Sequence, residues 1–150
     1  MELSVNWLES VPLRRENMPN FIYDCEVDDI PACAGVYIFG REHGAKFEAL
    51  YIGKSLNIKT RIKQHFKNLP LMKHIEQAKS GTRVIKIGLF KGKQGQNTDK
   101  CIKMVEKALS DHYSLLGNNI ANIQGTETEY HNIIFSGENI INVEEIYFKK

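Results

Sequence analysis

Apolar positions alternate or run together over two short segments in the first half of the chain. The segments 35–40 (GVYIFG) and 49–55 (ALYIGKS) are rich in residues that favour β-strands. The stretch 41–48 between them is polar and contains a glycine, as a hairpin connection does. An antiparallel pair of strands would hold Tyr37 and Tyr51 near each other on one sheet.

A glycine accompanies each tyrosine in these predicted strands. Gly35 comes shortly before Tyr37, and Gly53 comes shortly after Tyr51. Because glycine has no side chain, we expect the backbone here to be open to the close approach of a ligand or a phosphate.

The segment 57–66 has the periodicity of an amphipathic helix. Its apolar residues recur at four-residue intervals, and Leu69 continues the stripe. Ser55 or Asn57 can cap this helix, and Pro70 is expected to end it.

Arg61 and His65 lie one turn apart on this helix, along one border of its apolar stripe. From such a border an arginine can reach a phosphate above the sheet, where its planar fork of donors suits phosphate geometry. The alternatives are a solvated charge for Arg61 and a packed histidine at the core edge for His65.

A longer helix is predicted downstream, after a short helix at 71–79 and a strand at 82–90. Thr98 or Asp99 can cap it. Glu106 lies within the width of its apolar stripe, where a carboxylate is costly unless it is paired or bound to a metal. The apolar stripe consists of Ile102, Val105, Leu109, Tyr113 and Leu116.

The two glycine–tyrosine tripeptides, the arginine and histidine of the first helix, and the glutamate of the long helix resemble, in this order, the GIY-YIG nuclease family. The resemblance covers roughly residues 31 to 122. It implies an α/β (α+β) fold with a small, three-stranded, mainly antiparallel sheet flanked by helices. The usual proline before the family's asparagine is absent, so Asn118 and Asn119 are alternatives for that position.

The resemblance implies a metal-dependent endonuclease. Glu106 would hold one Mg²⁺ (or Mn²⁺) ion beside the scissile phosphate, with water filling most of the metal's shell. Tyr37 or Tyr51 would orient or deprotonate the attacking water, and Arg61 would bind the phosphate oxygens as charge builds. His65 would relay or accept a proton, with a pKa suited to neutral pH. The supporting residues would be Lys54 and Asn118.

Charge is distributed unevenly along the chain, although the net charge is only +2. Residues 54–103 carry thirteen Lys or Arg against two acids, a net of +11, whereas residues 1–30 carry −5 and residues 126–150 carry −3. The basic segment predicts a surface for a polyanion, with an affinity that falls steeply with salt. The alternative is a set of solvated helix faces balanced by the acidic ends. The expected nucleic-acid-binding residues are Lys59, Lys63, Lys91 and Lys93.

Composition sets the outer limits of these predictions. A chain of 150 residues with 42% hydrophobic content predicts one globular domain. Within it we expect an acidic N-terminal extension over 1–30, a nuclease core over 31–125 and a β-rich extension over 126–150. Two β-rich runs in the last segment predict a hairpin that joins the sheet edge or serves dimerisation. Three cysteines without disulfide or zinc spacing, and no segment of membrane-spanning length, predict a cytoplasmic protein with reduced thiols.

The sequence therefore predicts a magnesium-dependent endonuclease that acts on DNA with low intrinsic sequence specificity. A homodimer or a separate targeting protein would supply further recognition. The alternative is a nucleic-acid-binding module that has kept the fold without cleavage. Such a module would be expected to lose Glu106, Arg61 or a tyrosine first, and all of these are present. A small nuclease recruited by a partner would share the same chemistry.

Overall fold

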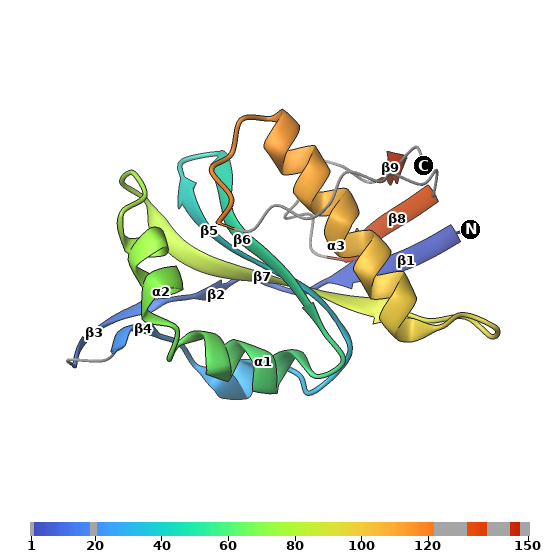
Figure 1. Cartoon of the computed structure of the whole chain (residues 1–150), viewed down its shortest axis with the longest axis horizontal. Coiled ribbons are helices and arrows are strands. Elements are labelled where there is room, and N and C mark those ends of the chain that lie inside the picture. The colour runs from blue at the N-terminus through green and yellow to red at the C-terminus, as the bar shows by residue number, and fades with distance from the viewer. Residues whose placement is uncertain (1, 19–20, 122–131, 138–144, 148–150) are drawn as a thin grey trace.

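A seven-stranded, mostly antiparallel sheet forms the centre of the computed structural model, which describes residues 2–18, 21–121, 132–137 and 145–147 (Figure 1). The strands are β1 (Glu2–Trp7), β2 (Val11–Pro12), β3 (Arg14–Met18), β4 (Phe21–Asp24), β5 (Gly35–His43), β6 (Lys46–Ser55), β7 (Thr82–Lys91), β8 (Asn132–Gly137) and β9 (Glu145–Tyr147). The sheet order is β6-β5-β7-β1-β8-β9, with β2 also paired to β7, while β3 and β4 form a separate hairpin. The predicted α/β class and mainly antiparallel sheet are confirmed, but the sheet has seven strands and not three, because β1, β2, β8 and β9 extend it.

The three strands predicted from the sequence, β5, β6 and β7, are present and pair in an antiparallel manner. Strands β5 and β6 are longer than predicted, because most of the polar stretch 41–48 belongs to them. Only Gly44 and Ala45 form the turn, and Gly44 has a φ of +63°. A glycine at the first position of a two-residue hairpin turn adopts such a φ without strain.

A β-bulge on β6 changes the direction of its side chains. Phe39 pairs with Tyr51 but Gly40 pairs with Ala49, so Leu50 is an extra residue on β6. Leu50 and Tyr51 consequently both pack on one face of the sheet, whereas Ala49 packs on the other. Bulges commonly re-aim side chains in this way. Tyr51 lies opposite Phe39 in the regular register, which puts it on the same face as Tyr37, and the bulge adds Leu50 to that face.

Three helices cover the two faces of the sheet (Figure 1). They are α1 (Ile58–His65), α2 (Leu69–Glu76) and α3 (Thr98–Leu115). Helices α1 and α2 pack on the face that carries Tyr37, and α3 packs on the opposite face against β5 and β6. Each helix contributes an apolar stripe to a buried cluster, as the periodicity predicts.

Asparagine caps the first turn of each helix. Asn57 caps α1 by accepting a hydrogen bond from the backbone N–H of Thr60, and Asn97 caps α3 by accepting one from Lys100. The prediction of Thr98 or Asp99 as the cap of α3 is therefore wrong by one or two positions. The prediction for Pro70 is also wrong: α1 ends at His65, and Pro70 lies in the first turn of α2, capped by Asn68. Proline is compatible with a first turn because its missing N–H would have no helical partner there.

The N-terminal strand β1 lies inside the central sheet. It pairs antiparallel with β7 on one side and parallel with β8 on the other. Leu3, Val5 and Trp7 are buried in the core under α3. The first strand of the predicted extension thus belongs to the same sheet as β5 and β6, because its alternating apolar residues cover the α3 face.

Strands β8 and β9 pair antiparallel at the edge of the sheet, as predicted for the tail hairpin. The remaining parts of the two predicted β-rich runs lie outside the described residues. Cys25 and Cys101 are buried and Cys33 is exposed, all three as free thiols. Within the described part of the chain, no helix is long and apolar enough to cross a membrane.

Candidate active site

A buried hydrogen bond joins β5 to α1 at the centre of the candidate site. The Tyr37 hydroxyl lies 2.6 Å from His65 Nε2, and the two side chains are 1% and 3% exposed. His65 reaches Tyr37 because it lies on the face of α1 that packs on the sheet. The structure therefore brings together two residues that are 28 positions apart in sequence.

Tyr51 completes an aromatic cluster with these two residues. Its ring stacks on Tyr37 with centroids 6.4 Å apart and meets His65 edge-on at 5.0 Å. Phe39 packs against all three rings. The predicted proximity of Tyr37 and Tyr51 is confirmed. Tyr51 is only partly buried, so it is the more accessible of the two tyrosines.

The glycines of the two tripeptides make room for protein atoms. A Cβ on Gly53 would overlap the ring and hydroxyl of Tyr37, and a Cβ on Gly35 would overlap the backbone carbonyl of Gly88. The expectation that these glycines open the backbone to a ligand is therefore wrong. Their small size allows Tyr37 to lie across β6 and β5 to approach β7 closely.

Arg61 projects from the exposed side of α1 beside the aromatic cluster. One of its terminal nitrogens donates a hydrogen bond to Gln64 Oε1 over 3.0 Å. Its positive charge and hydrogen bonding favour the ionised forms of Tyr37 and Tyr51 and lower the pKa of each, against the stronger effect of burial. The arginine thus lies next to both hydroxyls, at the border position that the sequence predicts.

Burial shifts the titration of the aromatic cluster. Loss of hydration raises the pKa of Tyr37 and of Tyr51 above the usual value for tyrosine. Burial, followed by the nearby Arg61 charge, lowers the pKa of His65 to about 4. The expectation of a His65 pKa suited to neutral pH is therefore wrong, because a charged imidazolium would be desolvated here. At neutral pH His65 is uncharged.

Glu106 enters the site from α3, on the opposite face of the sheet. The residue is 5% exposed, and burial raises the pKa of its carboxyl, while the Lys54 and Lys103 charges partly counteract this rise. Its charge contributes to the raised pKa of both Tyr37 and Tyr51. Because β6 is the edge strand, Glu106 can act on the tyrosines around that edge.

Lys54, near the end of β6, interacts with the first turn of α3. Its ammonium lies 3.6 Å from a carboxylate oxygen of Asp99. Lys54 also stabilises the ionised form of Glu106, as the direction of its effect on that pKa shows. The predicted supporting residue therefore pairs with Asp99 and acts on Glu106 through its charge, and Asp99 is a neighbour that sequence reasoning missed.

The acidic groups of the site fit a hydrated divalent cation. No cluster of three or more His, Cys, Asp or Glu side chains with metal-binding geometry occurs among the described residues. Magnesium does not require one, because it commonly binds through one or two carboxylates and keeps several waters. The nearly buried Glu106 carboxylate is a suitable donor, since a buried negative charge is favoured by a cation beside it.

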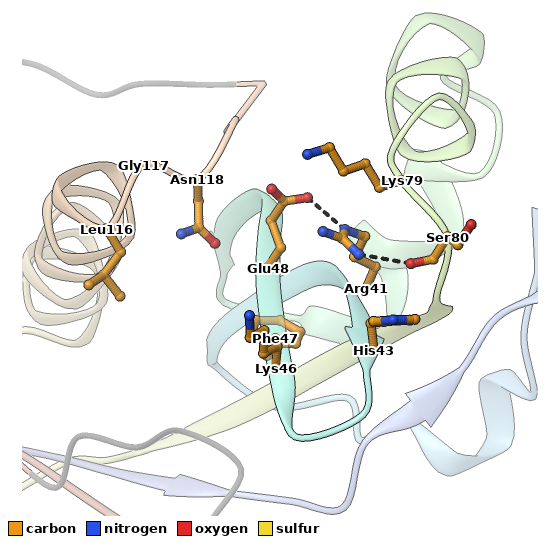
Figure 2. Close-up of a pocket in the computed structure, with 10 residues that line it drawn as sticks. All are labelled: Arg41, His43, Lys46, Phe47, Glu48, Lys79, Ser80, Leu116, Gly117 and Asn118. Atoms are coloured by element: carbon orange, nitrogen blue, oxygen red, sulfur yellow. Dashed lines mark hydrogen bonds and ion pairs between the residues drawn. The ribbon is translucent and has the colours of Figure 1, made fainter.

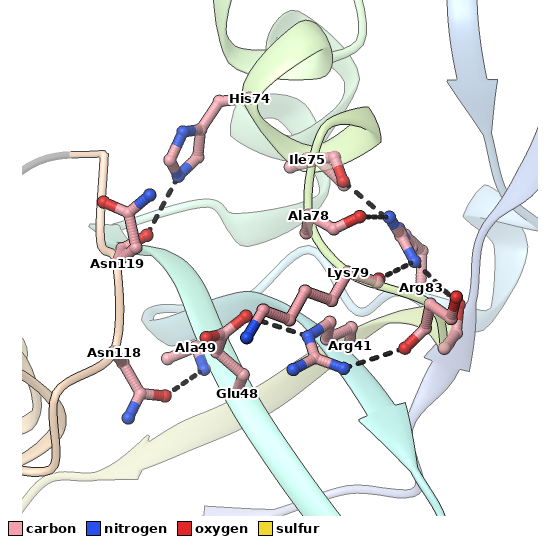
Figure 3. A network of polar contacts seen from close by, with 12 residues as sticks. Arg41, Glu48, Ala49, His74, Ile75, Ala78, Lys79, Arg83, Asn118 and Asn119 are labelled. Carbon is pink, nitrogen blue, oxygen red and sulfur yellow. Dashed lines mark hydrogen bonds and ion pairs between the residues drawn. The ribbon is translucent and has the colours of Figure 1, made fainter.

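The two candidate asparagines lie in the turn that follows α3 (Figure 3). The Asn118 side-chain oxygen accepts a hydrogen bond of 2.6 Å from the backbone N–H of Ala49 on β6. The Asn119 backbone oxygen lies 3.0 Å from His74 Nε2 on α2. Asn118 therefore holds the turn against the edge strand, and its expected support of a metal shell stays a prediction.

The four predicted nucleic-acid-binding lysines divide into two pairs. The Lys59 ammonium lies 3.8 Å from a carboxylate oxygen of Asp28, and the Lys93 ammonium lies 2.5 Å from a carboxylate oxygen of Glu2. Acidic residues of the N-terminal segment therefore partly neutralise these two lysines. Lys63 and Lys91 are exposed. Exposed ion pairs are weak and screened by salt, so a polyanion can compete for these lysines.

Comparison with models of protein families matches residues 33–114 to the GIY-YIG catalytic domain. This match spans more than half of the chain, so the protein belongs to the GIY-YIG family. Membership implies a nuclease-type function, since the family generally consists of endonucleases that act on nucleic acid. Neither the comparison with curated proteins nor that with solved structures gave a match.

Proposed function

We propose that this protein is a DNA endonuclease that uses one Mg²⁺ (or Mn²⁺) ion held at Glu106. The observation that supports it is the arrangement around β6: Tyr37, Tyr51 and His65 pack together on one face, and the charges of Arg61 and of Glu106, which comes from the other face, both shift the pKa of the two tyrosines. Helix α1 and helix α3 thus contribute to one site although they cover opposite faces of the sheet.

Tyr51 is the better candidate to contact the attacking water. It is only partly buried, whereas the Tyr37 hydroxyl is enclosed and engaged with His65. Nε2 of neutral His65 can accept a hydrogen bond from the Tyr37 hydroxyl, and this bond fixes the orientation of the two side chains in the aromatic cluster. In this proposal Tyr37 and His65 are positioning residues, and Tyr51 orients the water.

Arg61 would bind the non-bridging oxygens of the scissile phosphate. It is exposed, lies beside both tyrosines and carries a fork of donors that can reach two oxygens at once. Its charge would stabilise the additional negative charge of the transition state. A metal at Glu106 would supply Lewis-acid stabilisation of the same phosphate.

Cleavage of supercoiled plasmid by the purified protein tests this proposal. We expect nicking with Mg²⁺, none with EDTA, and none from Glu106→Ala with Mg²⁺. Glu9→Ala is the matched control, because Glu9 is an exposed glutamate between β1 and β2. Equal nicking by wild type and Glu106→Ala would contradict the role of Glu106. Salt-sensitive DNA binding without any cleavage would instead support the non-catalytic binding module.

A further inference from the structure

A groove of about 700 Å³ lies at the turn end of the β5–β6 hairpin (Figure 2), and neither tyrosine lines it. Its walls come from the ends of β5 and β6, the turn after α2 and the turn after α3. We call it the hairpin groove. The residues important for its chemistry are Arg41, His43, Lys46, Glu48, Lys79 and Asn118.

The hairpin groove and the aromatic cluster share one face of β5. Tyr37 and Arg41 are four residues apart on an unbroken strand, so their side chains point to the same face. A rise of about 3.3 Å per residue separates them by roughly 13 Å. One strand of a duplex advances about 3.4 Å per nucleotide along the helix axis. The groove therefore lies about four nucleotides from the tyrosines.

Cationic side chains dominate the hairpin groove. Arg41, Lys46 and Lys79 face a single carboxylate, that of Glu48. Lys46 and Lys79 are exposed, and within the described residues neither takes part in an ion pair. Two lysines of this kind attract an anion without first having to release a carboxylate.

Arg41 is held in a fixed orientation at the floor of the groove. Its Nε donates to Glu48 Oε1 over 2.9 Å, and one terminal nitrogen donates to the Ser80 carbonyl over 2.8 Å (Figure 2). The side chain is 17% exposed. A guanidinium has five N–H donors, so three remain beyond these two bonds. An arginine that is already oriented loses little freedom when it binds a phosphate.

The wall after α2 is also fixed. The Arg83 guanidinium donates to the backbone carbonyls of five residues at the end of α2 and in the following turn (Figure 3). These bonds hold the segment that carries Lys79 and Ser80. The hydrogen bond from Ala49 to Asn118 holds the opposite wall. Both walls are therefore in place before any ligand binds.

We infer that the hairpin groove binds the phosphate backbone of the DNA flank, about four nucleotides from the scissile bond. This inference rests on the proposed function, since the groove serves a substrate that reaches the aromatic cluster. Arg41 contacts a phosphate directly, and Lys46 and Lys79 neutralise its neighbours. Such contacts carry no base specificity, because the backbone is the same in every sequence.

The test is a binding titration by fluorescence anisotropy on the full chain in EDTA, which separates binding from cleavage. The probes are a labelled duplex of about 20 base pairs and a labelled duplex of four base pairs closed by a non-nucleotide linker. Four base pairs span three steps of about 3.4 Å, roughly 10 Å, so only the longer duplex spans the distance between the cluster and the groove. The variants are Lys46→Ala and Lys79→Ala. Lys67→Ala is the matched control, because Lys67 is an exposed lysine in the turn between α1 and α2, outside the groove.

We expect each groove variant to bind the long duplex about fivefold more weakly at 0.1 M salt, and to lower the slope of log affinity against log salt by about one. Affinity for the short duplex and binding by Lys67→Ala should stay within twofold of wild type. Wild-type affinity in both groove variants would contradict DNA binding by the hairpin groove, while leaving the proposed nuclease function intact. Absence of DNA binding by wild type would overturn both.

Discussion

The two ends of the β5–β6 hairpin belong to the same pair of strands but have opposite chemistry. At the end near α1, Tyr37, Tyr51 and His65 form a packed aromatic cluster with a buried hydrogen bond. At the turn end, Arg41 and Glu48 form a partly exposed ion pair beside a groove with two lysines that make no ion pair to any described residue. Residues of one strand therefore have different roles: Tyr37 is enclosed in the aromatic cluster, and Arg41, four positions later, carries a charge at the groove.

This difference indicates how one small sheet divides two tasks. Burial in the aromatic cluster fixes side-chain positions and shifts pKa values, which suits groups that must be oriented for chemistry. Exposure in the hairpin groove keeps the lysine charges hydrated and lets them form and release phosphate contacts readily, which suits binding of the DNA backbone. Variants at the two ends should therefore fail in different ways.

The largest difference is expected between the two arginines. Arg61→Gln should reduce plasmid cleavage by about 10²–10³-fold, because a donor to the transition-state charge is lost. Its melting temperature should remain near that of wild type, since Arg61 is exposed. Arg41→Gln should affect DNA affinity more than the rate at saturating DNA. Equal losses of saturated rate in both variants, measured by gel quantification, would remove the proposed distinction.

The pH dependence of stability tests the buried state of His65, which distinguishes the aromatic cluster from the exposed hairpin groove. The pKa of His65 is about 4 in the folded protein against an ordinary 6.5, so protonation favours the unfolded chain as pH falls from about 6.5 to 4. This lowers the stability of wild type by roughly 3 kcal/mol across that window. In His65→Gln this loss is absent. Urea unfolding at pH 7 and pH 4.5 should show the stability gap between the two proteins narrowing on acidification; a constant gap would contradict a neutral buried His65.

Removal of single hydroxyls separates the two tyrosines. Tyr37→Phe should destabilise the fold by about 1–3 kcal/mol, because it leaves the buried His65 nitrogen without its partner. Tyr51→Phe should cost less stability and more cleavage rate, since Tyr51 is the more accessible hydroxyl. Thermal unfolding and initial nicking rates measure both effects. A larger rate loss in a folded Tyr37→Phe variant would assign the water to Tyr37 instead.

The smallest effect is expected at the turn end of the hairpin. Glu48→Gln removes the one carboxylate that the described residues contribute to the hairpin groove, so affinity for the long duplex should rise about twofold to fivefold. Stability should fall by less than about 1 kcal/mol, because the Arg41 pair is partly solvated. Glu9→Gln serves as the charge-matched control in the same anisotropy titration. An equal gain of DNA affinity in Glu9→Gln would mean that the change in net charge alone, and not the groove, explains the effect.

Local patterns predicted the elements that carry the site. The four-residue spacing of Ile58, Ile62 and Phe66 places α1 correctly, with Asn57 as one of the two caps considered. The β-rich runs locate β5, β6 and β7, and the amphipathic stripe locates α3 with Glu106. Each of these signals depends on residues close together in sequence, which is why periodicity can detect them.

Features that depend on distant contacts could not be obtained in this way. The bulge at Leu50 exists only in the register with β5, and the lowered pKa of His65 depends on the packing of α1 on the sheet. Strand β1 is an intermediate case. The alternation of Leu3, Val5 and Trp7 is a visible period-two signal, but its place between β7 and β8 requires partners far along the chain.

The position of β1 has a consequence for how the chain folds during synthesis. Val5 is made well before both of its partners, because it pairs with Phe90 on one side and with Phe135 on the other. Non-local pairings of this kind slow folding, and an unpaired strand is a site for incorrect association until they form. Strand β1 must therefore wait until β8 has been made before both of its edges are covered. The site residues on β5, β6 and α1 are made during this interval, while one edge of β1 is still uncovered.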